Sequence, residues 1–123
     1  MSSLGITLAE FGAGHATLEM PFNRNFDQHH GFMHAGIITT AMDSACGFAA
    51  FTLMAATAEV LTIEFKANFL SPAKGERFIF RAEVLKPGRT ISVAEAKTYA
   101  VSEGQEKLVA AMTATLMAVT LDD

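Results

Sequence analysis

The chain has 123 residues, of which 50% are hydrophobic and 18% are charged, and its formal net charge is −4. This composition is typical of a single globular domain, here residues 1–123, and excludes an intrinsically disordered chain. The acidic balance argues against a nucleic-acid-binding protein, and the single cysteine, Cys46, excludes a disulfide framework and a multi-cysteine zinc site.

The first 22 residues predict two short strands joined by a tight turn. Apolar residues alternate within 6–8 and 16–20, and the glycines of 12–14 supply the turn. The N-terminus has no basic region and no apolar signal core, and no uncharged apolar run reaches the roughly 20 residues that a membrane span needs. We therefore expect a protein of the cytoplasm that binds no membrane.

Residues 34–51 predict the one strong helix of the chain. The segment is rich in alanine and contains no proline, and it follows a polar, irregular loop over residues 23–33. Because the helix is apolar on nearly every side, we expect it to be buried all round.

After the helix the apolar period changes to two, which predicts four strands. They cover residues 61–69, 78–84, 91–101 and 108–119. In the first of them, Thr62 and Glu64 are expected on one face and Phe65 on the other. Tight turns at 86–89 and 102–105 indicate antiparallel pairing. The prediction is an α+β fold in which an antiparallel sheet wraps one buried helix.

Asp43 does not fit a buried apolar helix. A carboxylate in such a place costs several kcal/mol unless it is paired or its pKa moves. One interpretation is structural, with the carboxylate hydrogen-bonded to Thr39 or to amides of a strand. The other is a general base or nucleophile with a pKa tuned by its environment.

The segment just before the helix is rich in polar side chains. His29, His30 and His34 are three of the four histidines, but no suitable fourth ligand is nearby and Gly31 disfavours a helical histidine pair, so we expect no metal site.

Alternatively, the backbone amides of this segment could take part in a reaction. The amides of Ala35 and Gly36 at the helix start, with the helix dipole, could stabilise a developing oxyanion, and Gln28 could add a side-chain donor. A purely structural His34 would bond to a nearby carbonyl.

These residues carry a family resemblance that covers roughly residues 5–120. The motif Gln28-x-x-Gly31-x-x-His34-Ala35-Gly36, followed by Asp43 and by the turns of 70–75 and 86–89, resembles the hotdog-fold acyl-CoA thioesterases. The most similar branch is the phenylacetic-acid-pathway (PaaI-like) thioesterase type, which includes thioesterase-superfamily member 2. The resemblance implies a hotdog fold and a homodimer or homotetramer with its active sites at the subunit interface. It also implies hydrolysis of acyl-CoA without a separate cofactor, since coenzyme A is part of the substrate.

The resemblance also implies roles for individual residues. Asp43 matches the catalytic carboxylate, Gln28 a residue that positions water or the thioester, and Thr62 a hydroxyl that helps to orient water. The Ala35 amide matches the oxyanion donor, with His34 beside it. The family's His-Gly-Gly is His-Ala-Gly here; alanine keeps the amide but requires an ordinary backbone conformation.

Substrate contacts are expected from two sets of residues. The phosphates of CoA would meet the cations in turns, Lys74, Lys86 and Arg89. The motif residue Gly31 and apolar side chains would line the acyl site, the candidates being Phe32, Met33, Phe48 and Phe51. The identity of the acyl group, aryl or alkyl, is left open.

Three other functions remain as alternatives. The first is a non-hydrolytic acyl-CoA-binding hotdog domain, because a fold does not fix a function. The second is a hydratase or dehydratase, although the His-Phe-Pro and Asp-x-Asn-Pro-x-His patterns of those relatives are missing from the sequence. The third is a structural dimer in which Asp43 has no catalytic role.

Overall fold

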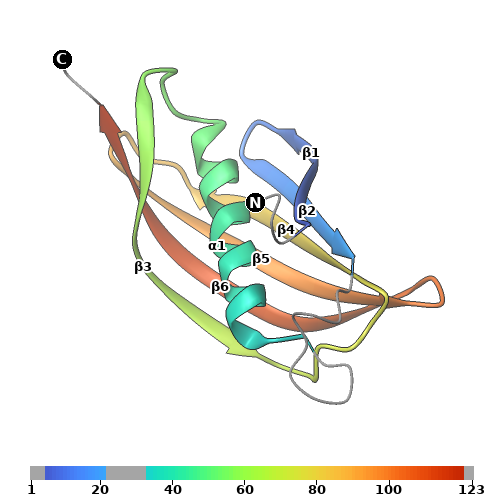
Figure 1. Ribbon diagram of the computed structural model, residues 1–123. Coiled ribbons are helices and arrows are strands. Elements are labelled where there is room, and N and C mark those ends of the chain that lie inside the picture. The colour runs from blue at the N-terminus through green and yellow to red at the C-terminus, as the bar shows by residue number, and fades with distance from the viewer. Residues whose placement is uncertain (1–4, 22–32, 121–123) are drawn as a thin grey trace.

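The computed structural model describes residues 5–21 and 33–120, and within them one helix lies across one antiparallel sheet (Figure 1). The elements in chain order are β1 (Thr7–Gly12), β2 (His15–Pro21), α1 (Ala35–Phe51), β3 (Ala58–Phe69), β4 (Arg77–Lys86), β5 (Ile91–Ser102) and β6 (Gln105–Thr120). The strands form a six-stranded sheet in the order β1-β2-β4-β5-β6-β3, and every pair is antiparallel. The predicted α+β architecture is confirmed.

The hairpin turns explain much of this order. Glu103 and Gly104, between β5 and β6, have φ angles of 50° and 77°. Two successive residues with positive φ are the signature of the two-residue turn that matches strand twist. Gly88, between β4 and β5, is needed for space instead, because a Cβ there would collide with the Ile91 carbonyl oxygen.

The core lies between α1 and the concave side of the sheet. The helix contributes mostly small side chains, including the fully buried Ala41 and Ala45. The strands contribute larger ones, such as Leu18, Phe78 and Phe80, each at most 1% exposed. Because small residues face the sheet, the helix backbone can approach it closely, and the large strand side chains fill the space on either side.

The prediction that α1 is buried all round is wrong for the single chain. Gly36, Thr40, Phe48 and Phe51 are exposed, and Asp43 is only half-buried. The physical reason is that one sheet layer can cover only one side of a helix. We call this uncovered side the open face of α1.

The predicted alternation along β3 is also wrong at one position. The register shifts between Thr62 and Glu64, which marks a β-bulge. Thr62 pairs with Leu116, which is buried on the helix side, whereas Glu64 pairs with Thr115 and accepts its hydroxyl hydrogen bond at 2.9 Å. The bulge therefore turns Thr62 toward α1 and leaves Glu64 on the outer face of the sheet.

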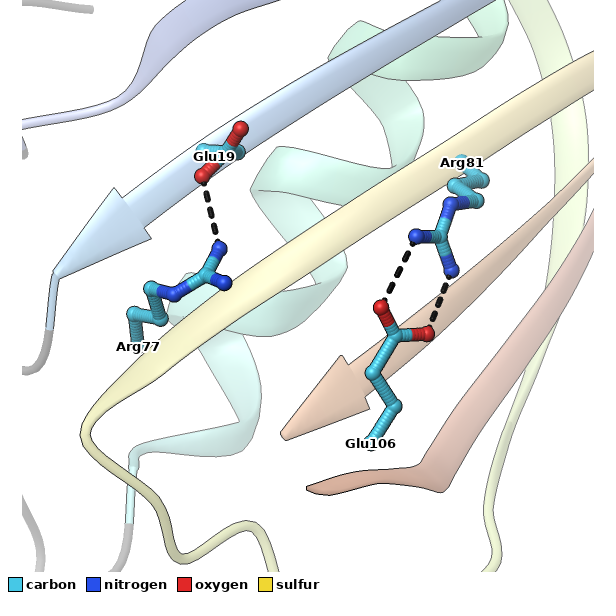
Figure 2. Close-up of polar contacts among 4 residues, drawn as sticks. All are labelled: Glu19, Arg77, Arg81 and Glu106. Atoms are coloured by element: carbon cyan, nitrogen blue, oxygen red, sulfur yellow. Dashed lines mark hydrogen bonds and ion pairs between the residues drawn. The ribbon is translucent and has the colours of Figure 1, made fainter. Parts of the chain in front are cut away.

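The outer face of the sheet carries solvated ion pairs. Figure 2 shows two ion pairs between strands. The Arg77 guanidinium lies 2.9 Å from a carboxylate oxygen of Glu19 on the neighbouring strand, and the Arg81 guanidinium donates hydrogen bonds of 2.8 and 3.0 Å to the two carboxylate oxygens of Glu106. The partners are roughly half exposed, so each pair adds little to the stability of the fold.

Candidate active site

Asp43 and Thr62 form a hydrogen-bonded pair on the open face of α1. The Thr62 Oγ1 hydroxyl donates to Asp43 Oδ1 at 2.7 Å, a short bond to a carboxylate. Within the described residues no donor contacts the second carboxylate oxygen, Oδ2, which leaves it able to accept a proton. Thr39, the partner in the structural interpretation, instead donates to the Ala35 carbonyl at 2.9 Å.

Space beside the carboxylate comes from small neighbours on the helix. Gly47 lies one turn after Asp43, and a Cβ added there would meet no atom within 4 Å. Ser44 is half-buried beside it. Ser44 and Gly47, which follow Asp43 on the helix, line a cavity on the open face of α1.

His34 caps the start of the helix. Its backbone is extended, with φ −64° and ψ 134°, and its Nδ1 accepts the Gly36 N–H at 2.9 Å. The ring nitrogen therefore serves as the acceptor that caps the helix N-terminus. The structural role that the described residues give to His34 is that of a helix cap, in which the ring accepts an amide.

The His34 cap occupies one of the two predicted amide donors and leaves the other available. The Gly36 amide is engaged by His34, and the amides of Ile37 and Ile38 donate to the His34 carbonyl. Within the described residues the Ala35 amide has no hydrogen-bond partner. Ala35 is thus the donor at the helix N-terminus that could stabilise an oxyanion.

One chain does not bring the donor and the carboxylate together. Ala35 and Asp43 are eight residues apart on one helix, which corresponds to about 12 Å along its axis. A general base and an oxyanion donor must both lie about 3 Å from atoms of the same reacting group. These two groups of the same chain therefore cannot act on one thioester.

The predicted substrate-binding residues fall into separate regions. The Met33 amide donates to the Ala73 carbonyl at 2.8 Å, which places the exposed Lys74 beside the helix start. Met33 itself is 4% exposed and belongs to the core. Phe48 and Phe51 lie on the open face, at 43% and 44% exposure. Gln28, Gly31 and Phe32 lie outside the described residues.

Lys86 and Arg89 lie far from Lys74 in the chain's own sheet. The residues after β3 bond to Val109 near the start of β6, whereas Thr90 bonds to Ala118 near its end. Nine strand residues separate these two points, which is about 30 Å. A single chain thus does not gather the three predicted cations at one site.

The sequence analysis did not predict that β3 lines a cavity on the open face of α1. A cavity of about 250 Å³ on the open face of α1 is lined by Ser44, Gly47, Phe48, Phe51 and Val60. Val60 pairs with Ala118 and so shares the helix side of the sheet with Thr62. No pattern in the sequence indicated that Val60 would line this cavity.

Cys46 is a fully buried helix residue one turn beyond Met42. Burial, with smaller contributions from the carboxylates of Asp43 and Glu95, raises the pKa of its thiol to about 12. The neutral thiol is a poor nucleophile, so Cys46 acts here as a small core residue.

This raised pKa makes stability depend on pH in the alkaline range. In the unfolded chain the thiol has a pKa of 9.0, whereas the native thiol stays protonated until about 12. The unfolded state therefore binds fewer protons over this range, and the free energy of unfolding falls as the pH rises from about 9 toward about 12. Urea denaturation at about pH 8 and about pH 10.5 should show a larger loss for the wild type than for Cys46→Ala. Equal losses in the two proteins would contradict the assignment.

The fold and this site together define a hotdog protein. A solved structure of a Thioesterase family protein from Silicibacter pomeroyi superposes with a TM-score of 0.96 at 56% identity, covering 98% of this chain and 89% of that one. A second, thioesterase HI1161 from Haemophilus influenzae, has a TM-score of 0.88 at 24% identity, over 99% of this chain and 83% of that one. At that identity the second likeness concerns the fold alone.

The family model described as Thioesterase superfamily matches residues 30–107, and the chain belongs to this superfamily. A curated relative from Saccharolobus solfataricus, "Putative esterase SSO2140", is 36% identical over 75% of this chain and 65% of its own length. Another from Halobacterium salinarum, "Putative esterase VNG_1336C", is 32% identical over 77% and 66%. The chain thus spans just under two thirds of these relatives. No helix among the described residues is long and apolar enough to cross a membrane.

Proposed function

We propose that this protein hydrolyses acyl-CoA thioesters to the free carboxylic acid and coenzyme A. The observation that carries the proposal is the Asp43–Thr62 pair, in which one carboxylate oxygen accepts the Thr62 hydroxyl at 2.7 Å and no donor among the described residues contacts the other. The chain's membership of the Thioesterase superfamily supports it. The motif from Gln28 to Asp43 further supports a place in the phenylacetic-acid-pathway branch.

The reaction needs two groups that act on opposite sides of the thioester carbonyl. Asp43 accepts a proton from water as the water oxygen attacks the carbonyl carbon, or attacks that carbon itself and forms an anhydride that water then opens. The Ala35 amide stabilises the oxyanion as charge develops, and Gln28 is proposed to position water or the thioester. In the general-base route the C–S bond breaks after water has attacked, whereas in the nucleophilic route it breaks as the anhydride forms, before water opens the anhydride. In both routes the CoA thiolate leaves and takes up a proton.

A second copy of the chain resolves the separation of Asp43 from Ala35. We place Asp43 of one subunit opposite Ala35 of the partner subunit, so that each site is shared. Within one chain these groups are about 12 Å apart, a separation that supports a site shared between two copies. Lys74, Lys86 and Arg89, which are also separated within the chain, are proposed to contact CoA phosphates from two subunits.

The edge strand β3 supports this assembly. It ends the sheet next to β6, so its outer edge pairs with no other described strand. Its large apolar residues are about half exposed: Leu61, Ile63, Phe65 and Phe69. An apolar, unprotected edge is a site for strand pairing between copies. We propose a homodimer joined edge to edge through β3, which would also cover part of the open face of α1; two such dimers could form a tetramer.

A thiol-release screen tests the proposed function. The purified protein is mixed with aryl-CoA and alkyl-CoA esters, and free CoA is measured with a thiol reagent. Release well above that of Asp43→Asn supports hydrolysis. Tight binding of these esters without release across the panel would overturn hydrolysis and favour an acyl-CoA-binding domain.

A further inference from the structure

The cavity on the open face of α1 lies beside the edge strand β3. It has a volume of about 250 Å³, and its lining is apolar except for one hydroxyl: Ser44, Gly47, Phe48, Phe51 and Val60. A Cβ added at Gly47 would meet no atom of the described residues within 4 Å, so a further side chain has room here. An apolar hollow next to an unpaired edge strand is suited to receive an apolar side chain from a partner.

Positions on β3 and α1 can be matched in level, because the two elements run in opposite directions. Thr62 lies level with Asp43, since the two side chains share the 2.7 Å hydrogen bond. Val60, earlier on β3, lines the cavity together with Gly47 and Phe51, which come later on the helix. Figure 1 shows the same course, with the end of β3 near the start of α1. The residues of β3 after Thr62 therefore lie beside the first half of the helix.

The two-fold axis of the proposed dimer can be placed on these levels, and its placement rests on the proposed function. Asp43 opposite the partner's Ala35, repeated by symmetry, puts the axis midway between these positions, at the level of Thr39. That level lies about 6 Å before Asp43 along the helix. On β3 the same distance is about two steps of the ladder, at roughly 3.3 Å each. Counted along the β6 partners, where the bulge adds no step, two steps after Thr62 lead to Phe65.

This axis determines which side chains of the two β3 strands meet. An antiparallel pair centred on Phe65 brings together residues that lie equal numbers of steps before and after it. Val60 and Phe69 fulfil this condition, because their β6 partners are each four residues from the β6 partner of Phe65. Phe69 pairs with Ala110, which is buried on the helix side, so its own side chain is also on that side. The partner's Phe69 thus comes opposite Val60, a wall of the cavity.

We propose that Phe69 of the partner subunit inserts into this cavity and thereby sets the register of the dimer. Phe69 is 49% exposed in the single chain, and an aromatic side chain that fills a pocket is a typical anchor of an interface. The same register places the partner's small Ala67 opposite Thr62, two steps from the axis. The interface therefore leaves room for a substrate beside Asp43 and is closed next to it by an aromatic ring.

A size swap across the interface tests the inserted side chain. Phe69→Ala removes it and Gly47→Leu fills its place, so each change should raise the dissociation constant of the dimer by at least about 100-fold, since a dimer has two such contacts. Together the two changes should restore the constant to within about tenfold of the wild type, because the added side chain occupies the vacated space. Sedimentation velocity over a dilution series measures the constant, and urea denaturation checks the fold.

The matched control for this swap is Phe11→Ala. Phe11 is also exposed, at 65%, but it lies on β1, at the opposite edge of the sheet from β3. Its replacement should leave the dissociation constant unchanged. An unchanged constant in Phe69→Ala, or a double variant as weak as the product of the two single effects, would overturn the proposed contact.

Cross-linking tests the register independently, in a Cys46→Ala background that removes the one native cysteine. Phe65→Cys places its two thiols at the axis, so a short bismaleimide should join the subunits. Leu61→Cys should stay unlinked, because its two copies lie six steps, or about 20 Å, apart. Linking of Leu61→Cys, or no linking of Phe65→Cys, would refute this register.

Thiol release from acyl-CoA esters, measured on the same proteins, separates the two proposals. A dimer that passes the swap and cross-linking tests but hydrolyses no ester would keep the Phe69 contact and overturn hydrolysis. Clear turnover by a protein whose association does not respond to Phe69→Ala would overturn the contact and leave hydrolysis intact.

Discussion

Replacing Asp43 with asparagine should lower kcat/KM for a reactive acyl-CoA by a factor of about 10²–10⁴ while the fold is retained. Asparagine keeps an Oδ1 that can accept the Thr62 hydroxyl, so the 2.7 Å hydrogen bond can persist. What disappears is the negative charge and the oxygen that takes a proton or attacks the carbonyl. Steady-state thiol release measures the loss, and circular dichroism with urea denaturation checks the fold.

The chain provides a matched control for this substitution. Glu64 accepts the Thr115 hydroxyl at 2.9 Å, so it is also a carboxylate paired with a threonine across β3 and β6. It lies on the outer face of the sheet because of the bulge after Thr62. Glu64→Gln therefore removes the same charge from the same type of pair away from the proposed site and should leave turnover near the wild-type value. Full activity in Asp43→Asn would show that Asp43 is structural.

Mixing two inactive variants should restore activity if the site is shared between subunits. Ala35→Pro removes the one amide proposed to stabilise the oxyanion, and it should lower kcat by a factor of about 10²–10³. The change suits the backbone: Ala35 is the first helical residue, a position that tolerates proline, and His34 before it is already extended. A heterodimer of Ala35→Pro with Asp43→Asn then contains one intact site and one doubly altered site.

The expected activity of that heterodimer is about half that of the wild type per dimer, because one of two equivalent sites is complete. The two variants are co-expressed with different tags, purified over both, and compared with each variant alone. A single-chain site gives the opposite result, since each subunit then carries one damaged group and no mixing restores it. If the heterodimer is no more active than either variant alone, the shared site is refuted, whatever the oligomeric state.

The sequence by itself determined the order of the elements and the residues to examine. The change of period from 3.6 to 2 after residue 51 separated the helix from the strands, and the glycines near 13 and 104 marked the hairpins, because these signals are local. Asp43 stood out because a lone carboxylate in an apolar helix is costly wherever that helix packs. His34 to Gly36 were identified by the unpaired amides that any helix start has.

Only the tertiary structure decided what these residues contact. Thr62 faces Asp43 because a bulge shifts the β3 register, and alternation in a sequence does not reveal such a shift. Gly36 is a poor donor candidate because the His34 ring accepts its amide, which depends on a side-chain rotation. The open face of α1 arises from how far one sheet can wrap a helix. Such long-range packing depends on elements distant in the chain, so no local pattern encodes it.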